Sequence, residues 1–476
     1  MPVLAIDQGT SGTKAVVVDP EDGVLATAEV ALRPRYLPGG GVEQDPAEML
    51  ESVLSSGRRA IEQAGRAVDC ISLANQGETV LAWDPGSGSP LSQAVVWQDR
   101  RAAALCDELA DARELVSSRT GLVLDPYFSA PKLAWLRRNV TREGVVSTTD
   151  AWLVHELTGE FVTDASTASR SLVLDVDRVE WDPQLLDLFG LADEPLPSIV
   201  SCDECVGVTR AFGPELPVCG LVLDQPAALL AQGCWQPGEA KCTFGTGAFL
   251  LANTGGHAVR SGAGLTTSIA WRCRGQTTYC IDGQSYTVGS AVRWLIDLGL
   301  IGEASELDLV ATDDAGGVLC SPALAGLAAP WWRPDATASF TGMTLATRPA
   351  QLVSAMLQGI AAQLAELTDV IGTDLGQPLA SLRVDGGLTR SRALMQAVAD
   401  LTQLPISLYP SPHATALGAA ALGRLSLDPE LELQHAVLDW RPQASYDPGW
   451  SPARADEFRA RWRGAALAGL PREEQA

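Results

Sequence analysis

Two distant segments of the chain share one pattern, a short apolar run that ends in Asp-Gln. The first is residues 4–14 (LAIDQGTSGTK) and the second is residues 221–230 (LVLDQPAALL). An apolar strand that delivers a carboxylate into a turn rich in Gly, Thr and Ser suits an anionic ligand, because the backbone N–H groups of such a turn bind phosphate. Two such segments predict two turns facing one phosphate group, and therefore phosphoryl transfer from a nucleotide.

Composition narrows the class of protein. The chain has 476 residues, which is more than one ordinary core holds, so two domains are expected. Its net charge of −24 argues against a nucleic-acid surface and against an anionic membrane. We expect no signal peptide and no membrane span, because no apolar stretch reaches about 18–20 residues. The ten cysteines include one CxxC, Cys202 and Cys205, without further zinc ligands, and a cytoplasmic location is favoured.

The order of predicted elements is similar in the two halves of the chain. Strands are expected at residues 3–6, 14–19, 24–32 and 68–73, with a helix that Asp45 caps and that begins at Pro46 and ends near Ala64. In the second half, strands are expected at 218–223, 241–244, 382–384 and 406–409 and within 249–286, and helices at 351–371 (closed by Gly372), 391–401 and 413–425. This pattern predicts an α/β protein of two lobes with a cleft between them.

Two longer motifs lie at residues 127–139 (YFSAPKLAWLRRN) and at residues 339–358 (SFTGMTLATRPAQLVSAMLQ). They resemble the first and the second signature of the FGGY family of carbohydrate kinases, and within that family the chain is most similar to the glycerol kinases. The likeness to glycerol kinases rests on residues 95–98 (VVWQ), 120–128 (TGLVLDPYF) and 244–249 (FGTGAF). The resemblance implies two ribonuclease-H-like lobes, as in actin and hexokinase, with ATP, Mg²⁺ and a small polyol or sugar bound between them. The expected domains are 1–237 for substrate and phosphate, 238–445 for nucleotide, and a tail, 446–476, that packs on the lobes.

The resemblance also assigns roles around the substrate. Asp224 is the expected general base, which would take the proton of the attacking hydroxyl; a carboxylate that merely caps the helix starting near Pro226 is the structural alternative. The residues expected to bind substrate are Glu78, Trp97, Tyr127, Asp224, Gln225 and Phe249. Carboxylates and an amide would hold hydroxyl groups, while aromatic faces would cover the carbon backbone.

A further set of residues is expected to bind the nucleotide and its metal. Asp7 would orient Mg²⁺, directly or through water. The expected nucleotide-binding residues are Thr10, Ser11, Gly12, Lys14, Thr246, Gly289, Arg293, Gly387 and Ser391. Three of these depart from the glycerol kinase pattern: Lys14 replaces Arg, Arg293 replaces Gln, and Ser391 replaces Asn.

Gly77 is the departure that matters most for specificity. It stands where glycerol kinases have an Arg that holds a terminal substrate hydroxyl, and the loss removes a charged donor and is expected to open volume. Glycerol is the leading substrate, with product glycerol 3-phosphate. The alternative is a longer polyol or a ketose, such as erythritol, xylitol, ribulose or xylulose. A remote alternative is a non-catalytic sugar or nucleotide sensor, and the family also implies a homodimer or homotetramer.

Overall fold

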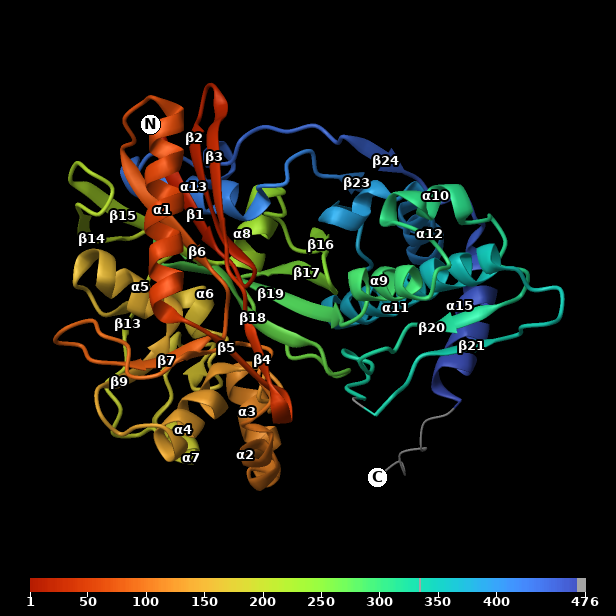
Figure 1. Ribbon diagram of the computed structural model, residues 1–476, viewed down its shortest axis with the longest axis horizontal. Helices are drawn as coiled ribbons and strands as arrows, with labels where there is room; N and C mark the ends of the chain where they lie inside the picture. Colours follow the sequence, from red (N-terminus) through yellow and green to blue (C-terminus); the bar gives the residue numbers. More distant parts are fainter. Residues whose placement is uncertain (334, 469–476) are drawn as a thin grey trace.

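The computed structural model describes residues 1–333 and 335–468 and shows two α/β lobes, one on each side of the molecule in Figure 1. The first lobe is built on a six-stranded sheet in the order β14-β15-β6-β1-β2-β3. Its strands are β1 (Val3–Gln8), β2 (Gly12–Asp19), β3 (Gly23–Ala31), β6 (Cys70–Asn75), β14 (Cys205–Thr209) and β15 (Leu216–Leu223). The second lobe is built on a seven-stranded sheet in the order β18-β19-β17-β16-β22-β23-β24. The two-lobed fold class predicted from the sequence is confirmed.

The pairing of the first sheet decides where its functional turns lie. Strand β6 is parallel both to β1 and to β15, with Gln8 opposite Asn75 and Leu223 opposite Asn75. The carboxyl ends of three strands therefore meet at one edge of the sheet. Every residue of β1 except the partly exposed Asp7 is buried, as are all residues of β6, so the edge is anchored in the core. The turns that follow these strands carry the residues predicted to bind substrate and phosphate.

Helices cover both faces of the first sheet. Helix α1 (Pro46–Ala64) starts where predicted, with Asp45 Oδ1 accepting the Ala47 N–H at 2.8 Å, and it packs on β1, β2 and β3. The opposite face is covered by α8 (Asp224–Ala231) and by α13 (Ala414–Leu427), a helix from the second half of the chain. A Cβ on Gly418 would lie 1.9 Å from the Ala227 carbonyl oxygen, so glycine is required for this close approach. The sequence analysis did not anticipate that α13 would leave its own half.

The rest of the first lobe forms a smaller α/β unit below the main sheet in Figure 1. Its five-stranded sheet has the order β4-β5-β8-β7-β9. The strands are β4 (Arg35–Leu37), β5 (Gly41–Gln44), β7 (Val80–Trp83), β8 (Ala94–Val95) and β9 (Val145–Thr148). The helices are α2 (Ala103–Glu108), α3 (Arg113–Thr120), α4 (Ser129–Asn139), α5 (Thr149–Thr158), α6 (Ala165–Ala168) and α7 (Pro183–Phe189). Short strands β10 (Val162–Asp164) and β13 (Ser198–Val200) pair with each other, as do β11 (Leu174–Asp175) and β12 (Glu180–Trp181).

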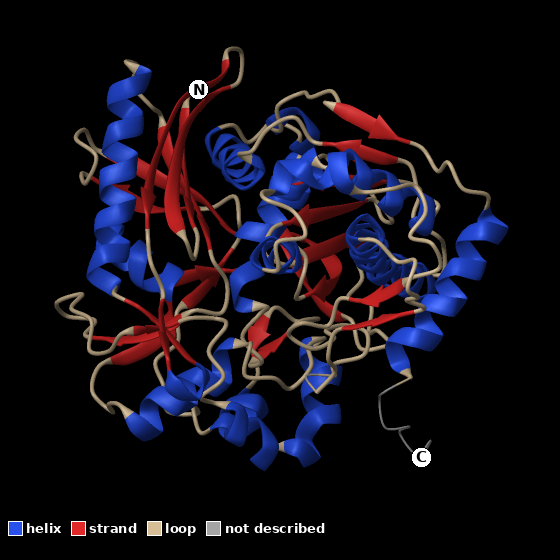
Figure 2. Ribbon diagram, turned by 45° about the vertical axis from the view of Figure 1, so that its right-hand side comes forward, coloured by secondary structure: helices blue, strands red, loops and turns tan. Residues whose placement is uncertain are grey.

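The second lobe places its sheet among helices, which Figure 2 draws in blue around the red strands. The sheet strands are β16 (Ala240–Phe244), β17 (Ala248–Gly255), β18 (Thr266–Cys273), β19 (Gln276–Ser285), β22 (Leu382–Asp385), β23 (Ile406–Leu408) and β24 (Ala444–Tyr446). The helices are α9 (Gly289–Asp297), α10 (Leu307–Val310), α11 (Pro349–Leu375), α12 (Arg392–Thr402), α14 (Leu433–Ala436) and α15 (Pro452–Leu467), and a hairpin joins β20 (Leu319–Ser321) to β21 (Ser339–Thr341).

One predicted helix end is wrong, and the tail enters the core. Helix α11 continues past Gly372 and ends at Gly376, which adopts the left-handed conformation with φ of 69°. The left-handed residue, rather than the first glycine, therefore ends the helix. In the tail, Trp462 on α15 is fully buried in the second-lobe core, and its Nε1 donates to the Cys320 carbonyl at 2.8 Å. Residues 469–476 of the tail lie outside the described residues.

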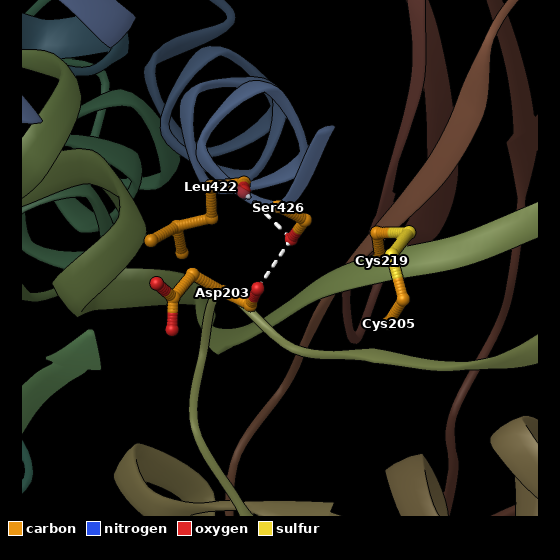
Figure 3. Close-up of a disulfide and its surroundings, with 5 residues drawn as sticks. All are labelled: Asp203, Cys205, Cys219, Leu422 and Ser426. Atoms are coloured by element: carbon orange, nitrogen blue, oxygen red, sulfur yellow. Dashed lines mark hydrogen bonds between the residues drawn. A yellow bond between two sulfur atoms is a disulfide. The ribbon is translucent and has the colours of Figure 1, made fainter. Parts of the chain in front are cut away.

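The two cysteines of the CxxC motif have different partners. Cys205 on β14 faces Cys219 on β15 across the ladder and forms a disulfide with it (Figure 3). Cys202 is buried and free. Beside the disulfide, Ser426 Oγ on α13 donates to the Asp203 carbonyl at 2.6 Å, which ties this loop to the helix (Figure 3). Spacing alone did not reveal the disulfide, because its partner lies on the next strand of the hairpin. Within the described residues, no helix is long and apolar enough to cross a membrane.

Candidate active site

Three carboxylates gather where β1, β6 and β15 end. Asp7 is near the end of β1, Glu78 follows β6, and Asp224 directly follows β15. Burial, followed by repulsion from Asp224, raises the pKa of Asp7 to about 7, although Lys14 opposes the effect. Burial, followed by repulsion from Glu78, raises the pKa of Asp224 to about 6. The sheet therefore concentrates negative charge that a proton, a metal ion or a cationic side chain must balance.

Arg170 supplies part of this balance and joins the two lobes. Its Nε donates to Glu78 Oε1 at 2.6 Å, and its Nη1 donates to Asp282 Oδ1 on β19 of the second lobe at 2.9 Å. The Arg170 and Glu78 side chains are 7% and 5% exposed, so this is a buried charge network. Burial alone would lower the pKa of Arg170, but Asp282 and Glu78 raise it well above its ordinary value. Sequence reasoning missed Arg170; the available signal was one arginine within a run of small residues, 165–171 (ASTASRS).

Lys241 is the second cation that the sequence analysis missed. It lies inside β16, its side chain is fully buried, and its Nζ donates to Gln225 Oε1 and, at 2.8 Å, to Thr243 Oγ1. Thr243 Oγ1 in turn donates to Asp385 Oδ1 at 2.6 Å. Burial lowers the pKa of Lys241, and the nearby Asp385 and Asp224 oppose that effect. Lys241 thus connects Gln225 of the first lobe to the second lobe, and its charge acts on the neighbouring Asp224. The sequence signal for it was a lysine within a buried strand.

The predicted substrate aromatics form one cluster built from both lobes. The Trp97 ring lies 5.4 Å from the Tyr127 ring and 6.5 Å from the Phe249 ring of β17, in edge-to-face geometry in both cases. All three side chains are partly exposed rather than buried in a core. Trp97 Nε1 donates to Thr10 Oγ1 at 2.9 Å, so the cluster also contacts the first phosphate turn. Apolar faces beside a few polar groups are typical of sites that bind small molecules.

Lys132 holds the loop that carries Tyr127. Its Nζ donates to the carbonyl oxygens of Pro126 at 2.8 Å, Tyr127 at 2.5 Å and Phe128 at 2.5 Å. The side chain is 1% exposed, and burial lowers the pKa of Lys132 to about 7. Three carbonyl oxygens bound to one ammonium group fix the backbone of this loop. The lysine lies within the segment 127–139 that resembles the first family signature, although no role was assigned to it.

The first phosphate turn is tightly constrained. Gly9 N donates to Gly12 O at 3.0 Å, and Thr10 Oγ1 donates to Gln76 Oε1 at 2.8 Å. A Cβ on Gly12 would lie 2.8 Å from the Val30 carbonyl oxygen, so no larger residue fits there. Ser11 is exposed at the tip of the turn, and Lys14 is partly exposed at the start of β2. The exposed backbone N–H and hydroxyl group of Ser11 can donate hydrogen bonds to an anion.

Three of the residues predicted to bind the nucleotide lie on the second lobe: Thr246, Gly289 and Gly387. They differ in how closely the surrounding backbone packs against them. Thr246 is exposed in the turn between β16 and β17. A Cβ on Gly289 would lie 2.5 Å from the Gly245 carbonyl oxygen, so this glycine brings the start of α9 against that turn. A Cβ on Gly387 would meet nothing within 4 Å, which leaves room for a ligand against the backbone. The nucleotide-binding roles of these three residues stay predictions.

Ser391 and Arg293, the two residues of the second lobe that differ from the glycerol kinase pattern, each interact with another residue of the protein. Ser391 is buried; its Oγ donates to Asp308 Oδ1 at 2.8 Å and accepts the Leu394 N–H at 3.2 Å, which caps α12. Arg293 is 77% exposed on α9 and lies 3.6 Å from Asp297. The hydroxyl of Ser391 is therefore engaged in capping the helix, and the contact predicted between Arg293 and a nucleotide stays a prediction.

The open volume expected at Gly77 is not found next to its backbone. A Cβ built on Gly77 would lie only 2.6 Å from Leu223 Cδ1. Leu223 is 5% exposed and its side chain already occupies the direction that a side chain at position 77 would take. The site therefore has no cation at this position, yet it has no empty space in that direction either.

Comparison with known proteins identifies the family. Residues 2–231 match the N-terminal domain, and residues 240–427 the C-terminal domain, of the FGGY family of carbohydrate kinases. The chain belongs to the FGGY family of carbohydrate kinases. It is 44% identical over 441 residues to a glycerol kinase of Alkalilimnicola ehrlichii, covering 88% of this chain and 89% of that one. It is 37% identical over 495 residues to glycerol kinase 2 of Thermotoga maritima, covering 99% of both.

A solved structure agrees with this assignment. The crystal structure of Plasmodium falciparum glycerol kinase with ADP superposes on this FGGY kinase with a TM-score of 0.92. The two chains are 31% identical, and the match covers 99% of this chain and 98% of that one. The similarity therefore extends over both lobes.

Proposed function

We propose that this protein is a glycerol kinase, which transfers the γ-phosphoryl group of ATP to a terminal hydroxyl of glycerol and releases ADP and glycerol 3-phosphate. The observation that carries the proposal is the position of Asp224, a partly exposed carboxylate beside Glu78, between the phosphate turn of Asp7 and the aromatic cluster of both lobes. The relatives named as glycerol kinases support the same substrate.

Asp224 acts as the base in this proposal. With a pKa near 6, it is largely ionised at neutral pH yet basic enough to accept the hydroxyl proton as the new P–O bond forms. Glu78, fixed by Arg170, accepts a hydrogen bond from a second hydroxyl, and the Trp97 and Phe249 rings cover the carbon chain. Closure of the lobes over the substrate excludes water and so suppresses wasteful hydrolysis of ATP.

The donor groups fit a magnesium nucleotide. Asp7 offers a carboxylate oxygen, Ser11 and Thr246 offer exposed hydroxyl groups, and Gly387 leaves the open space that a nucleotide base needs. Bound Mg²⁺ would neutralise phosphate charge as it develops. A carboxylate whose pKa lies near 7 is also one that gains most from a neighbouring cation, so Asp7 is the group we assign to the metal. We further propose, from the family, a cytoplasmic homo-oligomer.

A coupled assay of ADP release tests the proposal. Glycerol, erythritol, xylitol, ribitol, xylulose, ribulose and gluconate are each supplied at several concentrations with Mg-ATP. The expected result is the highest kcat/KM for glycerol and no turnover by Asp224→Asn, which should still bind ATP. Binding of ATP by the wild type without turnover of any substrate would favour the sensor alternative. A higher kcat/KM for a longer polyol or a ketose would overturn the assignment of glycerol.

A further inference from the structure

Gly77 and Leu223 form an interlocked pair next to the two carboxylates of the substrate site. Gly77 directly precedes Glu78, and Leu223 directly precedes Asp224. The parallel pairing of β6 with β15 places Leu223 opposite Asn75, two residues before Gly77. A Cβ on Gly77 would lie 2.6 Å from Leu223 Cδ1, 3.8 Å from its Cγ and 3.9 Å from its Cδ2. The leucine thus fills the direction in which a side chain at position 77 would extend.

Both members of the pair are held in place. The Leu223 N–H donates to Ser166 Oγ at 2.9 Å, and the side chain is 5% exposed. On the other side, the Thr79 N–H donates to the Gly77 carbonyl at 2.7 Å, and Glu78 has a φ of 60°, in the left-handed region. A non-glycine residue rarely adopts this conformation, so the surrounding structure dictates the course of this turn. Both backbones are hydrogen-bonded at this point, so room at position 77 depends on the Leu223 side chain.

We propose that Leu223 is a specificity-determining residue, which closes the end of the substrate site beside Gly77 with an apolar wall and restricts the enzyme to compact polyols of about three carbons. This inference rests on the proposed function. It replaces the expectation that Gly77 admits a longer substrate, because the space is occupied. It also implies that the substrate hydroxyl nearest this wall is held without a cation at position 77, so a guanidinium group installed there should tighten binding only if Leu223 makes room.

The first test removes the wall. Leu223→Ala should raise kcat/KM for erythritol relative to glycerol by at least tenfold, since apolar fit in a pocket discriminates by about 10–200-fold for each methylene. The matched control is Leu221→Ala, on the same strand and 3% exposed, which creates a cavity of the same kind two residues farther from Asp224. The control should leave the erythritol-to-glycerol ratio within twofold of the wild type.

The second test rebuilds the missing cation. Gly77→Arg alone should raise KM for glycerol, because the new side chain collides with Leu223. The double variant Gly77→Arg, Leu223→Gly should lower KM for glycerol about tenfold below that of the single variant. Far-ultraviolet circular dichroism and ATP binding confirm that each variant is folded.

The outcomes separate this inference from the proposed function. If the wild type phosphorylates glycerol but Leu223→Ala and Leu221→Ala give the same substrate ratio, Leu223 does not determine specificity, while the kinase assignment stands. If Gly77→Arg alone lowers KM as much as the double variant, the pair is not interlocked. If the wild type prefers erythritol or xylitol, the wall is refuted directly. If the wild type turns over no substrate of the panel, the proposed function itself fails.

Discussion

Replacing the candidate base with a neutral isostere should make the protein more stable at neutral pH even as it abolishes catalysis. Asp224 carries a pKa raised from 3.8 to about 6, because burial and the neighbouring Glu78 disfavour its charge. The folded state therefore binds a proton more tightly than the unfolded state, and stability from this group is lost as pH rises from about 4 to 6. A change from 3.8 to about 6 corresponds to about 3 kcal/mol of unfolding free energy. Asp224→Asn should recover about that amount at pH 8.

The pH dependence of the gain is the sharper part of this prediction. At pH 5, most of the wild-type carboxylate is protonated in the folded state, whereas most of it is ionised in the unfolded state, so the advantage of Asp224→Asn should fall to about 1.5 kcal/mol. Urea unfolding followed by tryptophan fluorescence at pH 5 and pH 8 measures both values. Asp456→Asn, at an exposed position on α15, is the matched control and should change stability by less than about 0.5 kcal/mol. A variant that is no more stable than wild type at pH 8, or whose advantage is the same at pH 5, would refute the reasoning.

Three further predictions follow from the charge network. The value of kcat/KM should fall on the acidic side of the pH profile with a midpoint near 6, the pKa of Asp224. Glu78→Gln should move that midpoint to lower pH, because it removes the repulsion between Glu78 and Asp224. A midpoint that does not move would argue against this coupling. Arg170→Met should lower the free energy of unfolding by about 3–5 kcal/mol, because it leaves the buried carboxylates of Glu78 and Asp282 without this partner. The control Arg178→Met, at a side chain that is 73% exposed, should lower it by less than about 1 kcal/mol. Equal losses of the two variants in urea unfolding would contradict this prediction. ATP hydrolysis without polyol should be far slower than the kinase reaction in the same ADP-release assay, and comparable rates would contradict the role of lobe closure.

Local patterns predicted the elements that carry the first lobe. Alternation and apolar runs marked β1 and β6, and the Asp45-Pro46 signal marked the start of α1. These elements depend on the conformational preferences of neighbouring residues, so short stretches of sequence are enough to predict them. The position of α13 on the first sheet was not predictable in the same way, because its largely apolar residues carry no local signal for one sheet or the other. That position depends on contacts with β15, β1, β6 and α8, which include the close approach of Gly418 to Ala227.

The candidate site shows the same division between local and long-range information. Asp7 and Asp224 were predicted from the strands that precede them, and their charges interact in the structure. Arg170 could not be placed in the same way, since its two partners lie 92 and 112 residues away in the chain. The contact between Gly77 and Leu223 was likewise invisible, because it depends on the register between β6 and β15. What sequence reasoning missed was in each case a pairing across the fold.

The buried cations explain how a chain with a net charge of −24 can accept a polyphosphate. Surface carboxylates act through water, which screens them within about 10 Å, whereas charges inside the junction of the lobes are screened far less. The buried cations that act most directly on the site are therefore Arg170, which is bonded to Glu78, and Lys241, whose charge acts on Asp224. Because Arg170 and Lys241 each contact both lobes, the residues that neutralise the carboxylates also hold the lobes together. Contact between the lobes and electrostatic balance are thus properties of the same side chains.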